Sequence, residues 1–129
     1  LVAVKDLMVT GKKIPLVTSN KDIKFAVKEM DKKNLGLVCV KEKNGMIGVI
    51  VDGDLRRNSN NLFNKKISEI SNKNPVWISE DATALTAIEK MTTLKISSLL
   101  VTNGKSINKK NKKITGVITT LQCLRRGIK

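Results

Sequence analysis

The same sequence pattern occurs twice in this chain of 129 residues, and it constrains the fold more than any other feature. Residues 14–19 align with residues 74–79, and a proline stands at the same point in each copy. Residues 48–51 and 116–119 both begin with glycine, and each segment runs on towards a Leu-Arg-Arg triplet. A tandem repeat of this kind predicts that one supersecondary unit is built twice.

Each copy predicts a strand, a helix, two further strands and a final helix. Ser19 followed by Asp22 is typical of a helix start, and apolar side chains then recur at the spacing of one helix face. The apolar residues of the two predicted helices are Ile23, Ala26, Val27 and Met30 in the first copy and Leu85, Ile88 and Met91 in the second. We therefore expect an α/β (α+β) fold of tandem β-α-β-β-α repeats, with the first repeat at residues 1–64 and the second at residues 65–129.

Short apolar runs at residues 36–40 and 98–101 predict buried strands after the two helices. In the first copy the following turn contains Asn44-Gly45, a pair that suits a tight hairpin because both residues tolerate positive φ. In the second copy the turn is replaced by a polar, lysine-rich loop at residues 103–113. Such a run of lysines is normally a solvated surface.

The composition excludes several classes of site. The chain has no histidine, and its two cysteines, Cys39 and Cys123, lie far apart in apolar segments. These residues predict small core side chains in a reducing compartment, with no zinc site and no Cys-His or Ser-His nucleophile. No run approaches the roughly 20 apolar residues of a membrane span. We expect a cytoplasmic protein that does not interact with membranes.

The net charge of +14 raises nucleic acid as a partner, but the sequence does not favour it. The basic residues are 21 lysines and four arginines, whereas only two phenylalanines and one tryptophan could stack on bases. All four arginines lie in the two Leu-Arg-Arg triplets. Because a guanidinium is a planar fork for phosphate or carboxylate, this placement favours a small anionic ligand. Alternatively, the arginines cap the C-terminal ends of two short helices or pair between the copies.

The segment Asp52-Gly53-Asp54 has two interpretations. Two carboxylates at this spacing could share a divalent ion, but the further ligands of a calcium loop are missing, so we expect no metal. The preferred interpretation is that Asp52 caps a short helix that begins near Gly53. Asp54 would then be free to face a cleft.

The duplicated pattern resembles a tandem pair of CBS domains over essentially the whole chain. Residues 48–57 are similar to a signature of the CBS pair at the C-terminus of bacterial arabinose-5-phosphate isomerases. The lead-in at residues 4–8, followed by 14–17, and the ending at residues 124–128 are similar to the same enzymes. The resemblance implies two repeats packed about a pseudo-twofold axis.

The resemblance also implies a parent enzyme with an upstream sugar-isomerase domain, which interconverts ribulose 5-phosphate and arabinose 5-phosphate on the route to Kdo and lipopolysaccharide. This chain would then have no catalytic residues and need no cofactor. It would form a homodimer and bind a nucleotide or a nucleotide sugar such as CMP-Kdo. The alternatives are a structural dimerisation module without a ligand and, less favoured, a basic nucleic-acid-binding domain.

CBS domains that bind adenosine nucleotides usually have glycine, two apolar residues, Ser or Thr, two variable residues and then Asp. The first copy departs from this pattern at Val51, and the second copy departs from it at Gln122. The two copies are therefore expected to bind unequally. The residues that the resemblance and the arginine placement propose for ligand binding are Asp52, Asp54, Arg57, Thr119, Gln122 and Arg125.

Overall fold

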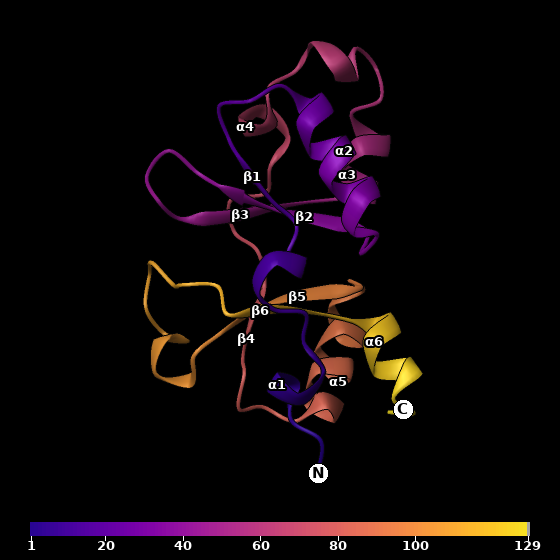
Figure 1. Cartoon of the computed structure of the whole chain (residues 1–129), viewed down its shortest axis with the longest axis vertical. Coiled ribbons are helices and arrows are strands. Elements are labelled where there is room, and N and C mark those ends of the chain that lie inside the picture. Colours follow the sequence, from indigo (N-terminus) through magenta and orange to yellow (C-terminus); the bar gives the residue numbers. More distant parts are fainter. Residues whose placement is uncertain (129) are drawn as a thin grey trace. The chain divides into compact units, whose positions relative to one another are not determined.

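The computed structural model describes residues 1–128, which form helices and strands in the predicted order (Figure 1). The helices are α1 (Val4–Leu7), α2 (Ile23–Lys33), α3 (Asp52–Arg57), α4 (Ile67–Ile70), α5 (Ala84–Leu94) and α6 (Thr120–Arg125). The strands are β1 (Leu16–Thr18), β2 (Leu37–Lys41), β3 (Ile47–Val51), β4 (Trp77–Ser79), β5 (Ser98–Thr102) and β6 (Gly116–Thr119). Short 3-10 turns occupy Gly11–Lys13, Leu62–Asn64 and Gly104–Ser106. The predicted α/β class and the repeated β-α-β-β-α order are confirmed.

The two repeats form sheets with the same topology. One sheet has the strand order β1-β2-β3, and the other has the order β4-β5-β6. In each, the first strand is parallel to the middle strand and the last strand is antiparallel to it. The predicted Asn44-Gly45 turn joins β2 to β3, with Gly45 at a φ of 84°.

Two compact units are present, and each is assembled from both repeats. One unit contains residues 12–75, and the other contains residues 1–11 together with residues 76–128. The lead-in to the first repeat contacts the second sheet, where Val9 pairs with Val117 of β6. The boundary predicted between residues 64 and 65 separates the two sequence repeats. The compact units do not follow this boundary, because residues 1–11 belong to the unit of the second sheet and residues 65–75 belong to the unit of the first sheet.

The lead-in to the second repeat likewise contacts the sheet of the first repeat. Residues 65–72 lead into the second repeat, yet Asn72 pairs with Val49 of the first sheet. The Ile23 N–H at the start of α2 donates to the Lys65 carbonyl oxygen at 3.0 Å. Each repeat therefore supplies the short helix that completes the unit of the other repeat.

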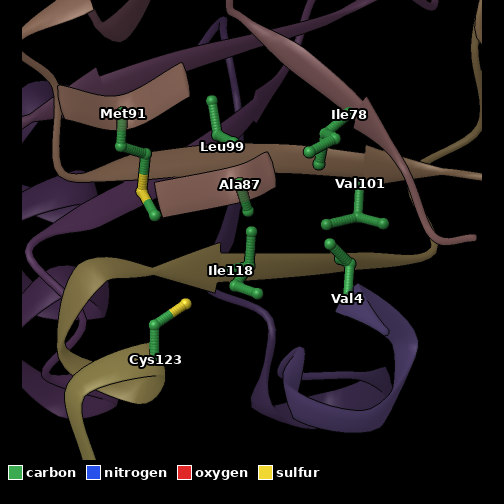
Figure 2. Packing of buried hydrophobic residues seen from close by; sticks show 8 residues of the cluster. All are labelled: Val4, Ile78, Ala87, Met91, Leu99, Val101, Ile118 and Cys123. Atoms are coloured by element: carbon green, nitrogen blue, oxygen red, sulfur yellow. The ribbon is translucent and has the colours of Figure 1, made fainter. Parts of the chain in front are cut away.

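Each unit has its own apolar core between one sheet face and the helices that cover it. In the unit of residues 1–11 and 76–128, Val4 of α1 lies among side chains from α5, β5 and β6 (Figure 2). The core of the other unit contains Ile23, Ala26, Met30, Val38, Val40, Ile50, Ile67 and Ile70. Full burial of one aliphatic side chain stabilises a fold by about 1.5–3 kcal/mol, so Ile23 of α2 and Met91 of α5 each stabilise the core of their own unit. The prediction that Leu85 belongs to the apolar face of its helix is wrong, because its side chain is 47% exposed and Ala84 and Ala87 are buried instead.

The predicted helix start at Ser19 is wrong. The N-cap of α2 is Asp22, and Ser19 is buried in the preceding turn. The reason is that residues 19–22 first turn the chain out of β1, so the helix begins later than the motif suggests. The equivalent helix α5 has Thr83 at its N-cap, whose hydroxyl accepts from the Thr86 N–H at 3.1 Å.

The long loop of the second repeat contains a 3-10 turn at Gly104–Ser106, and the Thr102 hydroxyl donates to the Lys113 carbonyl oxygen at 2.7 Å. Both cysteines are buried as free thiols. Within residues 1–128, the helices are too short and too polar for any of them to cross a bilayer.

Candidate functional site

The first candidate site is the corner where β3 turns into α3. Val51 is the N-cap residue, and its extended backbone ends the strand. Its N–H donates to Asp54 Oδ2 at 2.9 Å, so the Asp54 carboxylate satisfies a backbone donor that the helix leaves unpaired. The prediction that Asp52 caps this helix is wrong. The helix begins one residue earlier than expected, which places Asp52 in its first turn, where a carboxylate is favoured by the helix dipole.

The other oxygen of Asp54 holds an arginine. Arg57 Nη2 donates to Asp54 Oδ1 at 2.7 Å, and the side chains of Arg57 and Asp54 are 68% and 18% exposed. The guanidinium lies over Gly53, where an added Cβ would come within 2.9 Å of Arg57 Nη1. Both Asp54 oxygens therefore have partners, and the prediction that Asp54 is free to face a cleft is wrong. The exposed and already oriented group at this corner is Arg57.

The second candidate site is the equivalent corner between β6 and α6. The Thr119 N–H donates to Gln122 Oε1 at 2.8 Å, and the Gln122 N–H donates to Thr119 Oγ1 at 3.3 Å. These reciprocal bonds form a complete capping box. Gln122 thus replaces Asp54 without loss of the cap, because an amide oxygen accepts the same backbone bond as a carboxylate.

Arg125 occupies the position in α6 that Arg57 occupies in α3, six residues after the end of the preceding strand. Its side chain is exposed. Gln122 carries no charge to hold it, and no side-chain hydrogen bond or ion pair among residues 1–128 involves its guanidinium. The two corners therefore differ: the first presents an arginine oriented by a carboxylate, and the second presents an arginine without that support.

The sequence contained a signal for capping that the ligand interpretation missed. The residue three positions after the N-cap accepts the N-cap N–H in all four short helices, α1, α3, α4 and α6. In α1 the Ala3 N–H donates to Asp6 Oδ2 at 2.9 Å, and in α4 the Lys66 N–H donates to Glu69 Oε2 at 2.7 Å. The equivalent bonds of α3 and α6 are the ones described for the two corners. Because this spacing is regular, it could have been found before the structure was known.

The six predicted site residues thus form two sets of three. Asp52, Asp54 and Arg57 lie in the unit of residues 12–75, and the other three lie in the second unit. Within residues 1–128, no group of three or more Cys, Asp, Glu or His side chains is arranged to hold a metal ion. The chemistry that the corners offer is hydrogen bonding and charge, with arginine as the anion-binding group.

The family model of the CBS domain matches residues 4–61 and 67–128. The chain is 40% identical over 111 residues to the arabinose 5-phosphate isomerase KdsD of Francisella tularensis, an alignment that covers 83% of this chain and 34% of that protein. It is 30% identical over 132 residues to KdsD of Yersinia pestis, covering 99% of this chain and 38% of that protein. The chain therefore spans little more than a third of these relatives.

Solved structures show the same fold. The crystal structure of CBSX2 in complex with AMP has a TM-score of 0.81 and 18% identity, covering 98% of this chain and 96% of that chain. The CBS domain pair of protein MJ0100, in complex with 5′-methylthioadenosine and S-adenosyl-L-methionine, has a TM-score of 0.82 and 23% identity, with the same coverage. The resemblance to a tandem CBS pair is confirmed.

Proposed function

Because this chain belongs to the CBS domain family, we propose that it senses a small anionic ligand and regulates a sugar-phosphate isomerase to which it is joined. The chain is similar to two KdsD proteins over a little more than a third of their length. This similarity supports the proposal that the chain corresponds to the C-terminal regulatory region of such an enzyme. The proposed parent reaction is the interconversion of arabinose 5-phosphate and ribulose 5-phosphate for Kdo and lipopolysaccharide synthesis. Sequencing the coding region before Leu1 tests the link, and any reading frame without a sugar-isomerase domain contradicts it.

The observation that carries the ligand proposal is the oriented arginine at the β3–α3 corner. The Asp54 carboxylate accepts from Nη2 of the Arg57 guanidinium, and the Arg57 side chain is still 68% exposed. A fork held in place loses less conformational entropy when it binds phosphate than a free side chain does. The net charge of +14 attracts the same class of ligand.

We assign the ligand to anionic nucleotides or nucleotide sugars, with CMP-Kdo as the leading candidate. The complex of the related fold CBSX2 with AMP supports an anionic nucleotide. The complex of MJ0100 with 5′-methylthioadenosine and S-adenosyl-L-methionine supports only an adenosine-like ligand, because neither compound carries a phosphate. Asp52 is an exposed polar group in the first turn of α3 and is assigned to the same ligand, while Asp54 and Gln122 cap the two helices. Thr119 is only 6% exposed and its hydroxyl accepts from the Gln122 N–H, so its contribution is to the cap of α6. The first corner binds more tightly, because only there does a carboxylate orient the arginine.

The test is calorimetric titration of the chain with CMP-Kdo, CMP, AMP and arabinose 5-phosphate, combined with thermal unfolding. A ligand at 100 times its Kd stabilises the folded state by about 2.7 kcal/mol. Arg57→Gln should abolish this gain, whereas Arg56→Gln removes the same charge from the neighbouring exposed residue and should preserve it. A flat response to all four compounds, or equal losses in the two variants, refutes the proposal.

A second function, homodimerisation, is favoured by an asymmetry between the repeats. Leu85 and Leu94 of α5 are about half exposed and stand where α2 has Lys24 and Lys33. The neighbouring helix α6 likewise exposes two leucines, Leu121 and Leu124, in positions where α3 has Gly53 and Arg56. Four exposed leucines on two neighbouring helices of a strongly basic protein favour burial against a second copy of the chain.

Sedimentation velocity tests the dimer. We expect Leu124→Lys to convert a dimer into a monomer, because a buried ammonium without a partner opposes association. Leu16→Lys is the matched control, since Leu16 is 46% exposed in the other unit and Leu124 is 56% exposed. A wild-type chain that stays monomeric at high concentration refutes this function.

A further inference from the structure

A basic groove lies on the unit of residues 12–75, and its lining contains no residue of the β3–α3 corner. It is formed between the edge strand β1 and α2, and its volume is about 340 Å³. Leu16 and Phe25 supply an apolar floor, with 46% and 40% of their surfaces exposed. Lys21, Lys28 and Lys32 line the groove around this floor. It therefore combines positive charge with accessible apolar surface.

Within residues 1–128, the lysines that line this groove form no ion pair with a carboxylate, although Lys32 interacts electrostatically with Glu29. None of the four ion pairs found among residues 1–128 involves Lys21, Lys28 or Lys32. The acidic residue in the lining, Glu29, is already engaged, because its Oε2 accepts from the Leu16 N–H and from a neighbouring lysine, both at 3.1 Å. Its charge is thus largely compensated. The groove therefore has a net positive charge, which a negatively charged partner would neutralise.

Phe25 is part of the same charged environment. The Nζ atoms of Lys21 and Lys24 lie 5.0 Å and 5.5 Å from the centre of its ring. Lys24, Lys28 and Lys32 follow one another at intervals of four residues. Like charges at this spacing repel one another and destabilise a helix slightly. An anion bound beside these lysines would offset their mutual repulsion, which explains why they are clustered.

The second unit provides an internal comparison. Its helix α5 has the same length as α2, and its edge strand β4 corresponds to β1. There Thr86 stands in the place of Phe25, and Glu89 stands in the place of Lys28. The fold does not require an aromatic ring or clustered lysines at this position. The aromatic ring and the lysines on α2 are therefore specific to the first repeat, whereas the second unit places the Trp77 ring on β4, 5.7 Å from Lys112 Nζ.

The shape of the groove favours a peptide. Helix α2 contains 11 residues and is roughly 16 Å long. Its lysines are spread along this length, so they suit an extended ligand with several negative charges better than a single small anion. An added strand is disfavoured, because the Leu16 N–H of β1 is bonded to Glu29 and the Thr18 carbonyl oxygen accepts from the Lys21 N–H at 3.3 Å. A peptide that lies along α2 avoids both groups.

We propose that the groove between β1 and α2 binds an acidic peptide segment of a partner protein. An apolar side chain of the segment covers Leu16 and Phe25, and its carboxylates pair with Lys21, Lys28 and Lys32. None of the six residues assigned to the ligand-binding corners lines this groove. It gives the chain a protein partner in addition to the proposed small ligand.

The test is fluorescence anisotropy of the whole chain with a labelled synthetic peptide of alternating glutamate and leucine. Lys28→Glu and Phe25→Ser should each weaken binding roughly tenfold, as expected for central contacts. Lys110→Glu in the lysine-rich loop and Phe63→Ser, at a ring that is 65% exposed in the same unit, should leave binding within about twofold. Thermal unfolding of all four variants shows that they are folded.

Three results would overturn the proposal. Equal losses for Lys28→Glu and Lys110→Glu would show that the peptide responds only to the general charge of the protein. Unchanged binding by Phe25→Ser would remove the apolar contact. Inorganic polyphosphate that binds more tightly than the peptide, and without dependence on Phe25, would identify a site for phosphate chains instead.

Discussion

Truncation of Ile67 tests the exchange of segments between the repeats. Ile67 precedes the second repeat's own sheet, yet its side chain is fully buried in the core beneath β1, β2 and β3. Ile67→Ala removes three carbon atoms from a packed site, and truncations of this type cost about 2–5 kcal/mol. Since domains of this kind are stable by only about 5–15 kcal/mol, the loss is large.

Urea denaturation measures the total loss, and native-state hydrogen exchange locates it. We expect Ile67→Ala to reduce protection of the amides in β2 and β3 more than in β5 and β6. Val4→Ala should do the reverse, because Val4 of α1 is buried in the core of the other unit. These opposite patterns follow directly from the crossing of the two lead-in segments.

Phe63→Ala is the control for Ile67→Ala. It truncates a larger side chain in the same unit, but that side chain is 65% exposed, so the cost should stay within about 0.5 kcal/mol. A cost below about 1 kcal/mol for Ile67→Ala would show that the site is not tightly packed. Loss of protection centred on β5 and β6 would refute the assignment of α4 to the first sheet.

Three further predictions concern single groups. Asp54→Ala should lower the free energy of unfolding by about 1 kcal/mol in urea, whereas Asp54→Asn should cost less because it keeps an acceptor for the Val51 N–H. Burial raises the pKa of Cys39 from 9.0 to about 12, so the folded state keeps its neutral thiol and stability should fall as the pH rises from 9 towards 12, less steeply in Cys39→Ala. The hydrogen bond from Lys66 and its charge lower the pKa of Asp22, so a carboxyl NMR titration should show a higher Asp22 pKa in Lys66→Ala.

The role of individual corner residues was harder to predict than their position. The glycine-led strands placed Arg57 and Arg125 at equivalent points before any coordinates were known. The sequence did not show that Asp54 caps its helix and holds Arg57, because that depends on the helix beginning at Asp52. A shift of one residue in a helix start changes which side chain meets the free N–H. Capping roles therefore required the backbone.

The duplicated β-α-β-β-α order could be predicted from the sequence alone, because short apolar runs, prolines, glycines and helical spacing are local features that recur in both copies. Which lead-in segment packs on which sheet became clear from the folded structure alone. Residues 4–7 and 67–70 form similar short helices, and their local preferences would be met equally well on either sheet. The burial of Val4 and Ile67 against residues distant in the sequence determines which sheet each short helix covers. This pairing of helix and sheet is not visible in any periodicity along the chain.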